Sequence, residues 1–484
     1  MKMVRSNSVS SISLGLKVVD EDQIKQIHCA TLEALERTGV NVYEEESLKL
    51  LQDAGADVEG NRVRIPGWLI EQAIRWAPSK VTLSDRNGNR KLYLEGNNSY
   101  YGTGSDTPYV LDPYTGEHRV TCKEDVAKVA QIVDYLDNID FSMSMGLVSD
   151  CPTKTSDLHQ LEAQLLNTTK PVIFTIHTKE NLLGAIEMAS VIAGSEEEFR
   201  RAPFIALYTE PSSPLMHSKE SLEKLLICCD KGVPCVYTVG MMAGATAPIT
   251  AAGVLVSANC ELLSGLVIGQ LKRKGAPMIY GGMVTNMDMA AGTFLYSAPE
   301  LYLRQAVLHE MANFYRLPHF GVGGCSDSST FDQQAGWDNA FTLLAASLSG
   351  VNLIHDVGYL GQGLVASWES LVMCNEGIGL VKRFMKGIDV NEETLAVDEI
   401  DRIGPGGYYL QTEHTLKHFK DELWLPTLMN RKGYEVWKMD GKKTYGEKVN
   451  EKVKTILKTH IPEPLGAEKV KIIKGIIEEL ECQL

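Results

Sequence analysis

A glycine-rich segment, GVGGCSDSSTFDQQ, holds the densest group of side chains that could bind a small molecule. In it, Gly323 and Gly324 precede Asp327, Asp332 and Gln334. Glycines let the backbone approach a ligand closely, and the acidic and amide side chains can orient a polar or cationic group. A glycine turn followed by a helix-capping Asp or Ser is the alternative, and the residues alone favour neither.

A histidine and a carboxylate end another apolar run. His355 and Asp356 follow the residues VNLI, and Gly358 and Tyr359 come directly after them. At the end of a strand such a pair can orient a substrate or transfer protons. A histidine that is simply hydrogen-bonded within the core is the alternative, and in an arbitrary protein it is the commoner case.

Tyrosines gather in the segment YYGTGSDTPYVLDPYTG, which contains Tyr100, Tyr101 and Tyr109. Exposed aromatic faces attract a quaternary ammonium group by cation–π interaction, worth roughly 0.5 to 2 kcal/mol per ring. Loop tyrosines more often pack as a small satellite core, so these three raise the expectation of a cation cage only modestly.

The sequence gives little sign of a metal site or of a catalytic thiol. His414 and His418 are four residues apart, but no carboxylate lies between them in HTLKH, so a solvated helix is the better interpretation and no bound metal is predicted. Cys325 has no basic neighbour that would lower its pKa, and we expect it to pack in the core. Ten cysteines without a Cys-x-x-Cys pair indicate reduced thiols and a cytoplasmic location.

Seven short apolar runs, each followed by a helix-length segment, predict buried parallel strands that would position these residues. The runs are FSMSMGLV, PVIFTIH, PFIALYTE, PCVYTVG, PMIYGG, PHFGVGG and VNLIHDVG. Such α/β alternation fits a doubly wound sheet or a closed barrel. No Gly-x-Gly-x-x-Gly follows the first strand and each strand ends in a polar or glycine-rich loop, so we favour a (β/α)8 TIM barrel, whose reactive residues lie at the carboxyl ends of its strands.

Segments of different character flank the predicted barrel. Residues 1–125 alternate short helices with a hairpin centred on the Asn-Gly of KVTLSDRNGNRKLYLEG, which predicts an N-terminal α+β appendage. The barrel would occupy residues 126–412, with IDRIGPGGYYLQT at its end as a candidate for the eighth strand. Residues 413–484 would form a helical C-terminal extension packed on the outside.

Composition argues against several classes of partner. The formal charge of -15 makes binding to nucleic acid or to an anionic membrane unfavourable. The N-terminus lacks the unbroken apolar core of a signal peptide, and no run approaches the roughly 18 to 20 apolar residues of a membrane span. The long helical exterior leads us to expect a homo-oligomer.

Four long segments together resemble the trimethylamine methyltransferase family. They are MAGATAPITAAGVLVSANCELLSGLVIGQLKRKGAPMIYGG, GGCSDSSTFDQQAGWDNA, NLIHDVGYLGQGLVASWESLVMCNEGIGLVKRFMKGIDV and GYEVWKMDGKKTYGEKVNEKVKTILKTHIPEPL. The similarity covers nearly the whole chain. It implies a barrel enzyme that transfers a methyl group from an amine to the cobalt of cobalamin (a corrinoid) carried by a separate, small corrinoid protein.

The resemblance also indicates the class of substrate. The founding members carry pyrrolysine in the barrel interior, whereas this chain has only standard residues, its corresponding stretch being Gly321 to Cys325. Relatives without pyrrolysine use quaternary amines such as glycine betaine, carnitine or proline betaine. A quaternary nitrogen already carries the charge that makes a neutral amine leave, so attack by cobalt(I) needs no proton donor, and the site must mainly orient an N-methyl carbon.

The resemblance turns the candidate residues into a ranked set of substrate contacts. These are His355 and Tyr101 first, then Tyr100, Tyr359, Asp327, Asp332 and Gln334. His355 and Asp327 would orient the substrate, while Gly323 and Gly324 would leave room for it or for the corrin ring. Three other functions remain as alternatives: a trimethylamine-type methyltransferase, a quaternary-amine binding protein without catalysis, and a barrel lyase that uses a metal or a Schiff-base lysine.

Overall fold

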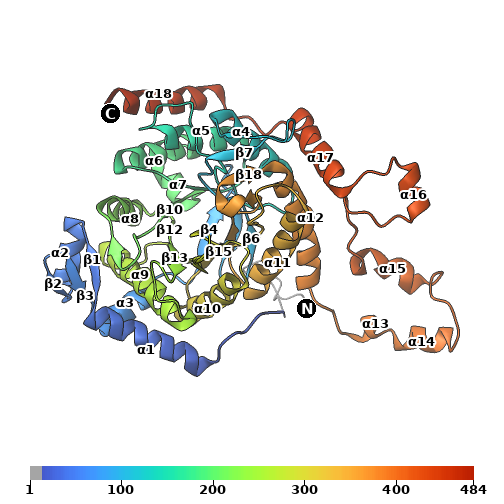
Figure 1. Ribbon diagram of the computed structural model, residues 1–484, viewed down its shortest axis with the longest axis horizontal. Helices are drawn as coiled ribbons and strands as arrows, with labels where there is room; N and C mark the ends of the chain where they lie inside the picture. Colours follow the sequence, from blue (N-terminus) through green and yellow to red (C-terminus); the bar gives the residue numbers. More distant parts are fainter. Residues whose placement is uncertain (1–13, 484) are drawn as a thin grey trace.

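Parallel strands close into an eight-membered ring within residues 14–483, the part of the chain that the computed structural model describes (Figure 1). Seven of them are β6 (Tyr100–Tyr101), β16 (Leu353–His355), β15 (His319–Val322), β14 (Met278–Asn286), β12 (Cys235–Tyr237), β10 (Ile205–Thr209) and β9 (Val172–Phe174), in that spatial order. Two parallel bridges, Gly102 to Phe141 and Ser142 to Val172, insert the eighth strand and close the ring. The predicted barrel is therefore confirmed.

The strand that the sequence left unplaced is β6, which pairs in parallel with β16 through Tyr100 and Tyr101. It lies inside the range 1–125 expected for the appendage. The candidate segment 400–412 was wrong, because it holds the end of helix α14 (Val397–Ile403) and a loop. A two-residue strand gives no periodic pattern, so only its partners identify it.

Helices alternate with the strands and form the outer layer. They are α4 (Lys123–Tyr135), α5 (Ser156–Asn167), α6 (Lys179–Ala193), α7 (Glu196–Arg201), α8 (Lys219–Lys231), α9 (Ala251–Lys272), α10 (Pro299–Tyr315), α11 (Gln333–Ser349) and α12 (Trp368–Met385). Local sequence signals set several ends. Ser218 caps the start of α8 by accepting from Ser221 N, and Gly232 ends it with φ +74°, which glycine adopts without strain.

The barrel interior is filled by one apolar side chain from most strands, including Ile173, Ala206, Ile279 and Phe320. The hairpin of β4 (Val81–Ser84) and β5 (Arg90–Leu94) packs against this layer through Val81, Leu83, Leu92 and Leu94 and plugs the end opposite the strands' carboxyl ends. The hairpin was predicted, but its turn runs from Asp85 to Asn89 and not through Asn-Gly alone, since Asp85 N donates to Asn89 O.

The N-terminal appendage packs on one flank. It comprises α1 (Glu21–Arg37), α2 (Glu45–Asp53), α3 (Gly67–Trp76) and a sheet of β1 (Val40–Val42), β2 (Asp57–Glu59) and β3 (Arg62–Arg64). A barrel loop joins this sheet, because β11 (Met216–His217) pairs in parallel with β1. The expectation about a signal peptide concerns a terminus whose residues 1–13 lie outside the described residues.

Helix α9 overturns one expectation. No run was expected to approach a membrane span, but the segment Ala251–Lys272 is long and apolar enough to cross a membrane. Its most apolar window is 72% buried inside the fold, where α1, α3 and α8 pack against it. Its apolar character is thus accounted for by packing against other helices.

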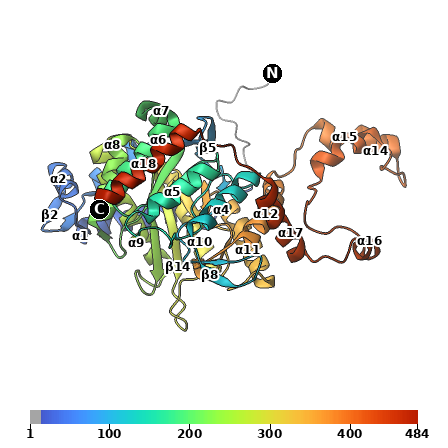
Figure 2. The ribbon, with the colours of Figure 1, turned by 90° about the horizontal axis from the view of Figure 1, so that it is seen from above.

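Short strands extend the structure at the carboxyl ends of the barrel strands. There β17 (Tyr359–Leu360), β18 (Val365–Ser367), β7 (Tyr109–Leu111) and β8 (His118–Val120) form a small sheet, η1 (Gly361–Gly363) connects β17 to β18, and β13 (Val239–Ala243) prolongs the pairing with β14. Figure 2 shows the loop after β14 projecting from this end, which we call the barrel mouth, while β5 lies toward the other.

The C-terminal extension is helical, as expected, but only part of it packs on the barrel. Helix α17 (Tyr445–Thr459) packs on α12 and α4, and α18 (Ala467–Gln483) packs on α6 and α5. Helices α13 (Glu392–Leu395), α14, α15 (Glu413–Glu422) and α16 (Tyr434–Met439) instead stand away from the barrel in Figure 1.

Candidate active site at the barrel mouth

Three tyrosines and a buried aspartate meet at the barrel mouth. Tyr208 comes from the end of β10, Asp356 and Tyr359 follow β16, and Tyr296 lies in the loop after β14. Burial raises the pKa of all three phenols, and the negative charge of Asp356 adds to the effect on each of them. We call these four residues the mouth cage.

Asp356 is the least satisfied group of the mouth cage. Its residue is 3% exposed, and Oδ2 has no hydrogen-bond partner. Burial raises its pKa well above the ordinary value, because nothing compensates the charge of the ionised form. Its backbone has φ +69°, a left-handed conformation that costs a non-glycine residue on the order of 1 kcal/mol or more. A carboxylate held this way is suited to pairing with a cationic ligand.

The rings are fixed by contacts outside the mouth cage. Tyr359 donates its hydroxyl hydrogen to Ser105 O and lies edge-on to Tyr296, with ring centroids 6.4 Å apart. Tyr208 packs on the ring of Phe320 at 5.6 Å and donates to Glu210 Oε2 at 3.3 Å. Tyrosine faces so arranged around a carboxylate are the usual surroundings of a bound organic cation.

Two more carboxylates, those of Glu210 and Asp106, lie beside the mouth cage. Glu210 is solvent-exposed, yet desolvation by the surrounding protein raises its pKa, a combination typical of a group on the wall of an open concavity. Burial also raises the pKa of Asp106, although Gln160 Nε2 donates to its Oδ1 at 2.9 Å. Lys224 donates its Nζ to Ile176 O at 2.7 Å, and its charge partly offsets the raised pKa of Glu210. The charge of His177 has the same effect on the pKa of Asp106. The wall therefore favours a positive charge.

Gly104 makes room for the mouth cage. A Cβ at this position would lie 2.1 Å from Asp356 Oδ1 and 2.3 Å from Cζ of Tyr359. Any larger residue would displace both side chains, so the loop after β6 can approach them only with glycine here.

His355 lies beside the mouth cage as a neutral ring. Its Nδ1 lies 2.9 Å from Gly321 O, so Nδ1 carries the hydrogen and Nε2 is left as an acceptor, 3.5 Å from Asp356 Oδ2. Burial lowers the pKa of His355 to about 3, and the ring is therefore uncharged at physiological pH. It can orient Asp356 or a ligand, but it supplies no positive charge.

Several expected contacts lie away from the mouth. Tyr100 points toward the plug, where its hydroxyl accepts from Tyr93 N. Tyr101 points outward and hydrogen-bonds Ser347 of α11 at 2.7 Å. A side chain on Gly323 would meet Ile354 and Ala346, so this glycine serves close packing of strand and helix and leaves no ligand space.

The polar residues of the glycine-rich segment have structural partners. Asp327 accepts from the backbone N–H groups of Tyr296 and Ser297, both at 2.9 Å, and so fixes the loop that carries Tyr296. Asp332 caps α11 by accepting from Ala335 N at 3.0 Å, which is the alternative interpretation of this segment. Gln334 is exposed on α11. None of the three side chains belongs to the mouth cage, and only Asp327 acts on it.

Gly324 and Cys325, the other two residues of this segment that the sequence singled out, serve packing. Gly324 has φ +74°, and a side chain there would press on Leu343 and Val357. Cys325 is fully buried near Tyr302 Oη, and burial raises the pKa of its thiol well above the ordinary value. A thiolate there is strongly disfavoured, in agreement with the expected packing role.

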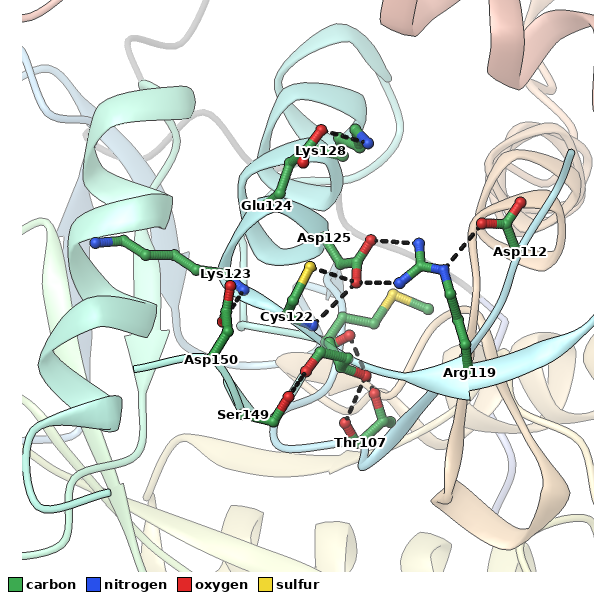
Figure 3. Close-up of polar contacts among 12 residues, drawn as sticks. Thr107, Asp112, Arg119, Cys122, Lys123, Glu124, Asp125, Lys128, Ser149 and Asp150 are labelled. Carbon is green, nitrogen blue, oxygen red and sulfur yellow. Dashed lines mark hydrogen bonds and ion pairs between the residues drawn. The ribbon is translucent and has the colours of Figure 1, made fainter. Parts of the chain in front are cut away.

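An ion-pair network ties the mouth loops to α4 (Figure 3). Arg119 of β8 donates to both oxygens of Asp125 at 2.6 and 2.7 Å and to Asp112 at 2.9 Å. Burial opposes ionisation of Asp125, but its hydrogen bonds from Arg119 and Cys122 dominate and lower its pKa. Below them Thr107 donates to Met145 O, which fixes the loop that carries Asp106. The network positions one wall of the site.

Comparison with known proteins identifies the family. The trimethylamine methyltransferase family profile matches residues 3–479. The chain belongs to the trimethylamine methyltransferase family. It is 32% identical to trimethylamine methyltransferase MttB of Desulfitobacterium hafniense, over 99% of this chain and 97% of the relative. It is 30% identical to a glycine betaine methyltransferase of the same species, over 93% of this chain and 94% of the relative.

The fold of this family member agrees with a solved structure. Monomethylamine methyltransferase of Methanosarcina barkeri superposes with a TM-score of 0.50, covering 97% of this chain and 89% of that chain. The sequence identity is 11%, so the likeness supports the barrel fold alone. Family membership makes the chain a methyltransferase, and its relatives act on different amines by name.

Sequence reasoning found part of the mouth cage and missed the rest. Tyr359 was proposed, and Asp356 was noticed beside His355 but not selected. Tyr208 and Glu210 end the predicted strand PFIALYTE, so the rule that reactive residues lie at carboxyl ends could have selected them. Tyr296 comes ten residues after the end of β14 and carries no such signal.

Proposed function

We propose that this protein demethylates a quaternary amine by transferring one methyl group to the cobalt(I) of a corrinoid carried on a separate protein. The C–N bond breaks and its electron pair stays on nitrogen, so a tertiary amine leaves, while cobalt(I) supplies the electron pair of the new bond to carbon. The substrate's own positive charge makes the amine a leaving group without a proton donor.

The mouth cage is the observation that carries this proposal. A quaternary ammonium has no N–H to donate, so a site can hold it only by charge and by aromatic faces. Asp356 offers an unpartnered buried carboxylate, and Tyr208, Tyr296 and Tyr359 surround it. No protonated base is required, which agrees with a neutral His355. The cage would orient the substrate and exclude water from the reacting methyl group.

The loops around the mouth support docking of a protein partner. Exposed apolar side chains from five of them form a rim: Leu147 at 38%, Ile249 at 55%, Met289 at 66%, Trp337 at 79% and Leu364 at 51% exposure. Each lies after a barrel strand and either before the next helix or near its start. Exposed apolar groups of this kind are typical of interaction surfaces. We assign this rim to the corrinoid protein.

Glycine betaine is the first substrate to test, because a family relative is a glycine betaine methyltransferase. The chain would be incubated with its corrinoid protein, reduced to cobalt(I), and a panel of glycine betaine, carnitine, proline betaine, choline and trimethylamine. Methyl transfer would be followed by the visible spectrum of the corrinoid and by the demethylated amine. Loss of the cobalt(I) spectrum with a quaternary amine, and not with trimethylamine, is the expected result.

Variants of the mouth cage make this test specific. Replacing Asp356 by Asn should lower kcat/KM by about 30-fold or more, because a buried charge–charge contact is worth about 2 to 5 kcal/mol. Tyr208→Leu should lower it about 3- to 30-fold through loss of one cation–π contact. Tyr100→Leu is the matched control, since Tyr100 faces the plug, and it should leave KM unchanged.

Four outcomes would contradict the proposal. A panel in which no quaternary amine changes the corrinoid spectrum would count against it, as would equal effects of Tyr208→Leu and Tyr100→Leu on KM. Calorimetric binding of a betaine without any methylation of cobalt would instead favour a binding protein. Transfer from trimethylamine alone would identify the other substrate class of the family.

A further inference from the structure

A cavity opens between helices of the outer layer, away from the mouth cage. It has a volume of about 550 Å³ and lies between α11 and α12, with residues 444–446 at the start of α17 forming part of its wall (Figure 1). A volume of this size is typical of sites for small organic molecules. None of the lining residues in the described chain belongs to the mouth cage, so this cavity is a separate feature.

Three helical glycines around the cavity are not explained by close packing. They are Gly336 in α11, Gly377 in α12 and Gly446 in α17, and none has a positive φ. A Cβ on Gly336 would have its nearest neighbour at 4.0 Å, and a Cβ on Gly377 or Gly446 at 3.5 or 3.6 Å, which are ordinary contact distances. Alanine would fit at each position and is the better helix former. These glycines therefore keep space open that a side chain could fill.

An amide oxygen without a partner lies in the wall of this cavity. Asn339 of α11 lines it and is 2% exposed, and its Nδ2 donates to Ser370 Oγ of α12 at 2.9 Å. Within the described chain its Oδ1 accepts no hydrogen bond. A buried acceptor without a donor is costly, and such a group in a folded protein calls for a bound partner. A ligand that donates a hydrogen bond would supply that partner.

A phenol provides a second polar group at the same cavity. Tyr445, the first residue of α17, lines the cavity, and its Oη is shielded from water and also has no partner among the described residues. Burial raises the pKa of this phenol, and the nearby negative charge of Glu376 adds to the effect, so it stays protonated and can either donate or accept. The cavity thus offers one fixed acceptor and one adaptable hydroxyl.

The rest of the wall is suited to an uncharged ring. It carries the sulfur atoms of Met373, Cys374 and Met429 and the ring of Phe331. Sulfur atoms make favourable contacts with aromatic rings. No lysine, arginine or histidine is among the described lining residues, and the carboxylate of Asp332 is already occupied in capping α11. An anionic ligand is therefore disfavoured, because no positive charge would compensate it.

We propose that this cavity binds a neutral heteroaromatic molecule that donates an N–H group, of a size between indole and a nucleoside. The N–H group would donate to Asn339 Oδ1, a second polar group would pair with Tyr445 Oη, and the ring would lie against the sulfur atoms in the space that the glycines leave. The bound molecule would join α11, α12 and α17. This proposal does not depend on the methyltransferase reaction.

Indole and benzofuran test the hydrogen bond to Asn339. The two molecules have nearly the same shape, but only indole donates. In ligand-observed NMR titrations of the full chain, indole should bind about three- to tenfold more tightly than benzofuran. Asn339→Leu, which removes the acceptor, should abolish this preference. Absence of binding by indole, adenine and adenosine alike would overturn the proposal, as would equal affinities of the parent chain for indole and benzofuran.

Filling the cavity tests its position. Gly336→Leu puts a side chain into the open space and should weaken binding of indole about tenfold or more, because the ligand and the leucine cannot share it. Gly475→Leu is the matched control, since it makes the same exchange on α18, where a Cβ meets no atom within 4 Å, and it should bind indole like the parent. Thermal unfolding would check that both variants fold.

Competition with glycine betaine separates this cavity from the mouth cage. Saturating glycine betaine should leave the affinity for indole unchanged, because the two sites share no residue. Displacement of indole by glycine betaine would place indole in the mouth cage and contradict the proposal. Equal affinities of Gly336→Leu and Gly475→Leu for indole would likewise place the binding site elsewhere.

Discussion

Asp356 shows how a single residue reveals the purpose of the site. A buried carboxylate without a donor is costly, and its left-handed backbone adds strain. A protein keeps such a group where a ligand compensates it. Because burial raises the pKa of Asp356, protonation of its carboxyl is favoured, and a cation bound beside it should lower that pKa and favour release of the proton.

Binding of a cation should therefore depend on pH. Below the raised pKa of Asp356 in the ligand-free protein, each unit of pH increase should strengthen binding of glycine betaine or tetramethylammonium by up to tenfold, because only the ionised form pairs with the cation. Above that pKa the affinity should level off. Calorimetry in buffers of different ionisation enthalpy would measure the proton released.

Asp356→Asn is the variant that assigns this proton. It should remove most of the pH slope, and any remainder belongs to Glu210 and Asp106, whose pKa values burial also raises. Burial raises the pKa values of the three phenols and lowers that of His355 to about 3, so these groups do not account for a slope near neutral pH. An unchanged slope in Asp356→Asn would contradict the assignment of the proton to this residue.

Asp327 should act through Tyr296 without touching substrate. Asp327→Ala removes the acceptor of the Tyr296 and Ser297 N–H groups and should raise KM about tenfold or more, with a change in unfolding free energy of about 1 to 2 kcal/mol. Asp327→Asn, which keeps an acceptor oxygen, should restore part of the KM. Steady-state kinetics with thermal unfolding would separate the two effects, and equal kinetics for Ala and Asn would argue against a positioning role.

At the scale of elements, the mouth depends on loops that are tied to helices. Gly104 can approach Asp356 only because Thr107, Thr121 and Ser149 hold the loops after the first two barrel strands. Arg119 ties the small sheet that continues from these loops to α4. Local sequence gives little sign of such ties, since their partners come from different elements.

Removal of Arg119 should measure the strength of this tie. Arg119→Met leaves the buried Asp125 charge unpaired and should lower the unfolding free energy by about 2 kcal/mol at pH 7, less than for a fully buried pair because Arg119 is partly exposed. Arg64→Met is the matched control, since its partners Asp57 and Glu59 are exposed where Asp125 is buried, and it should cause no measurable change.

The stability difference between the parent protein and Arg119→Met should become smaller as pH falls. The folded pKa of Asp125 is lowered, so the stabilisation is present above the unfolded value of about 3.9 and disappears as pH falls through the folded pKa. Chemical denaturation between pH 3 and pH 7 should show the two proteins converging at the acidic end. A constant difference across this range would mean that Arg119 stabilises by packing alone.

At the scale of the whole molecule, a very short strand closes the barrel. The ring is completed where Gly102 meets Phe141, and a Cβ on Gly102 would lie 2.3 Å from the Phe141 ring. The plug and β6 both come from residues before 102, so the N-terminal quarter of the chain is needed for closure as well as for the appendage.

Enlarging residue 102 while reducing residue 141 should test whether this contact closes the barrel. Gly102→Ala should lower the unfolding free energy by about 1 to 3 kcal/mol through overpacking, and Phe141→Leu in the same chain should restore part of it. Gly475→Ala on α18 is the control, because no atom lies within 4 Å of the added Cβ, and it should leave the protein as stable or slightly more so. If the double variant loses the sum of the unfolding free energies lost by the two single variants, the contact between residues 102 and 141 does not limit closure of the barrel.

The sequence by itself determined the barrel, the family and the class of chemistry. Apolar runs separated by helix-length segments have a periodicity that survives without tertiary contacts, and strand ends such as His355 and Asp356 follow from it. The long motifs identified the family for the same reason, because they are contiguous in the chain.

Tertiary structure decided which side chains meet. Tyr100 and Tyr101 alternate across β6, so one faces the plug and the other faces α11, and neither reaches the mouth. Tyr296 reaches it only through a loop held by Asp327. Strand rotation, barrel closure and loop anchoring are set by contacts between residues far apart in sequence, and no local pattern records them.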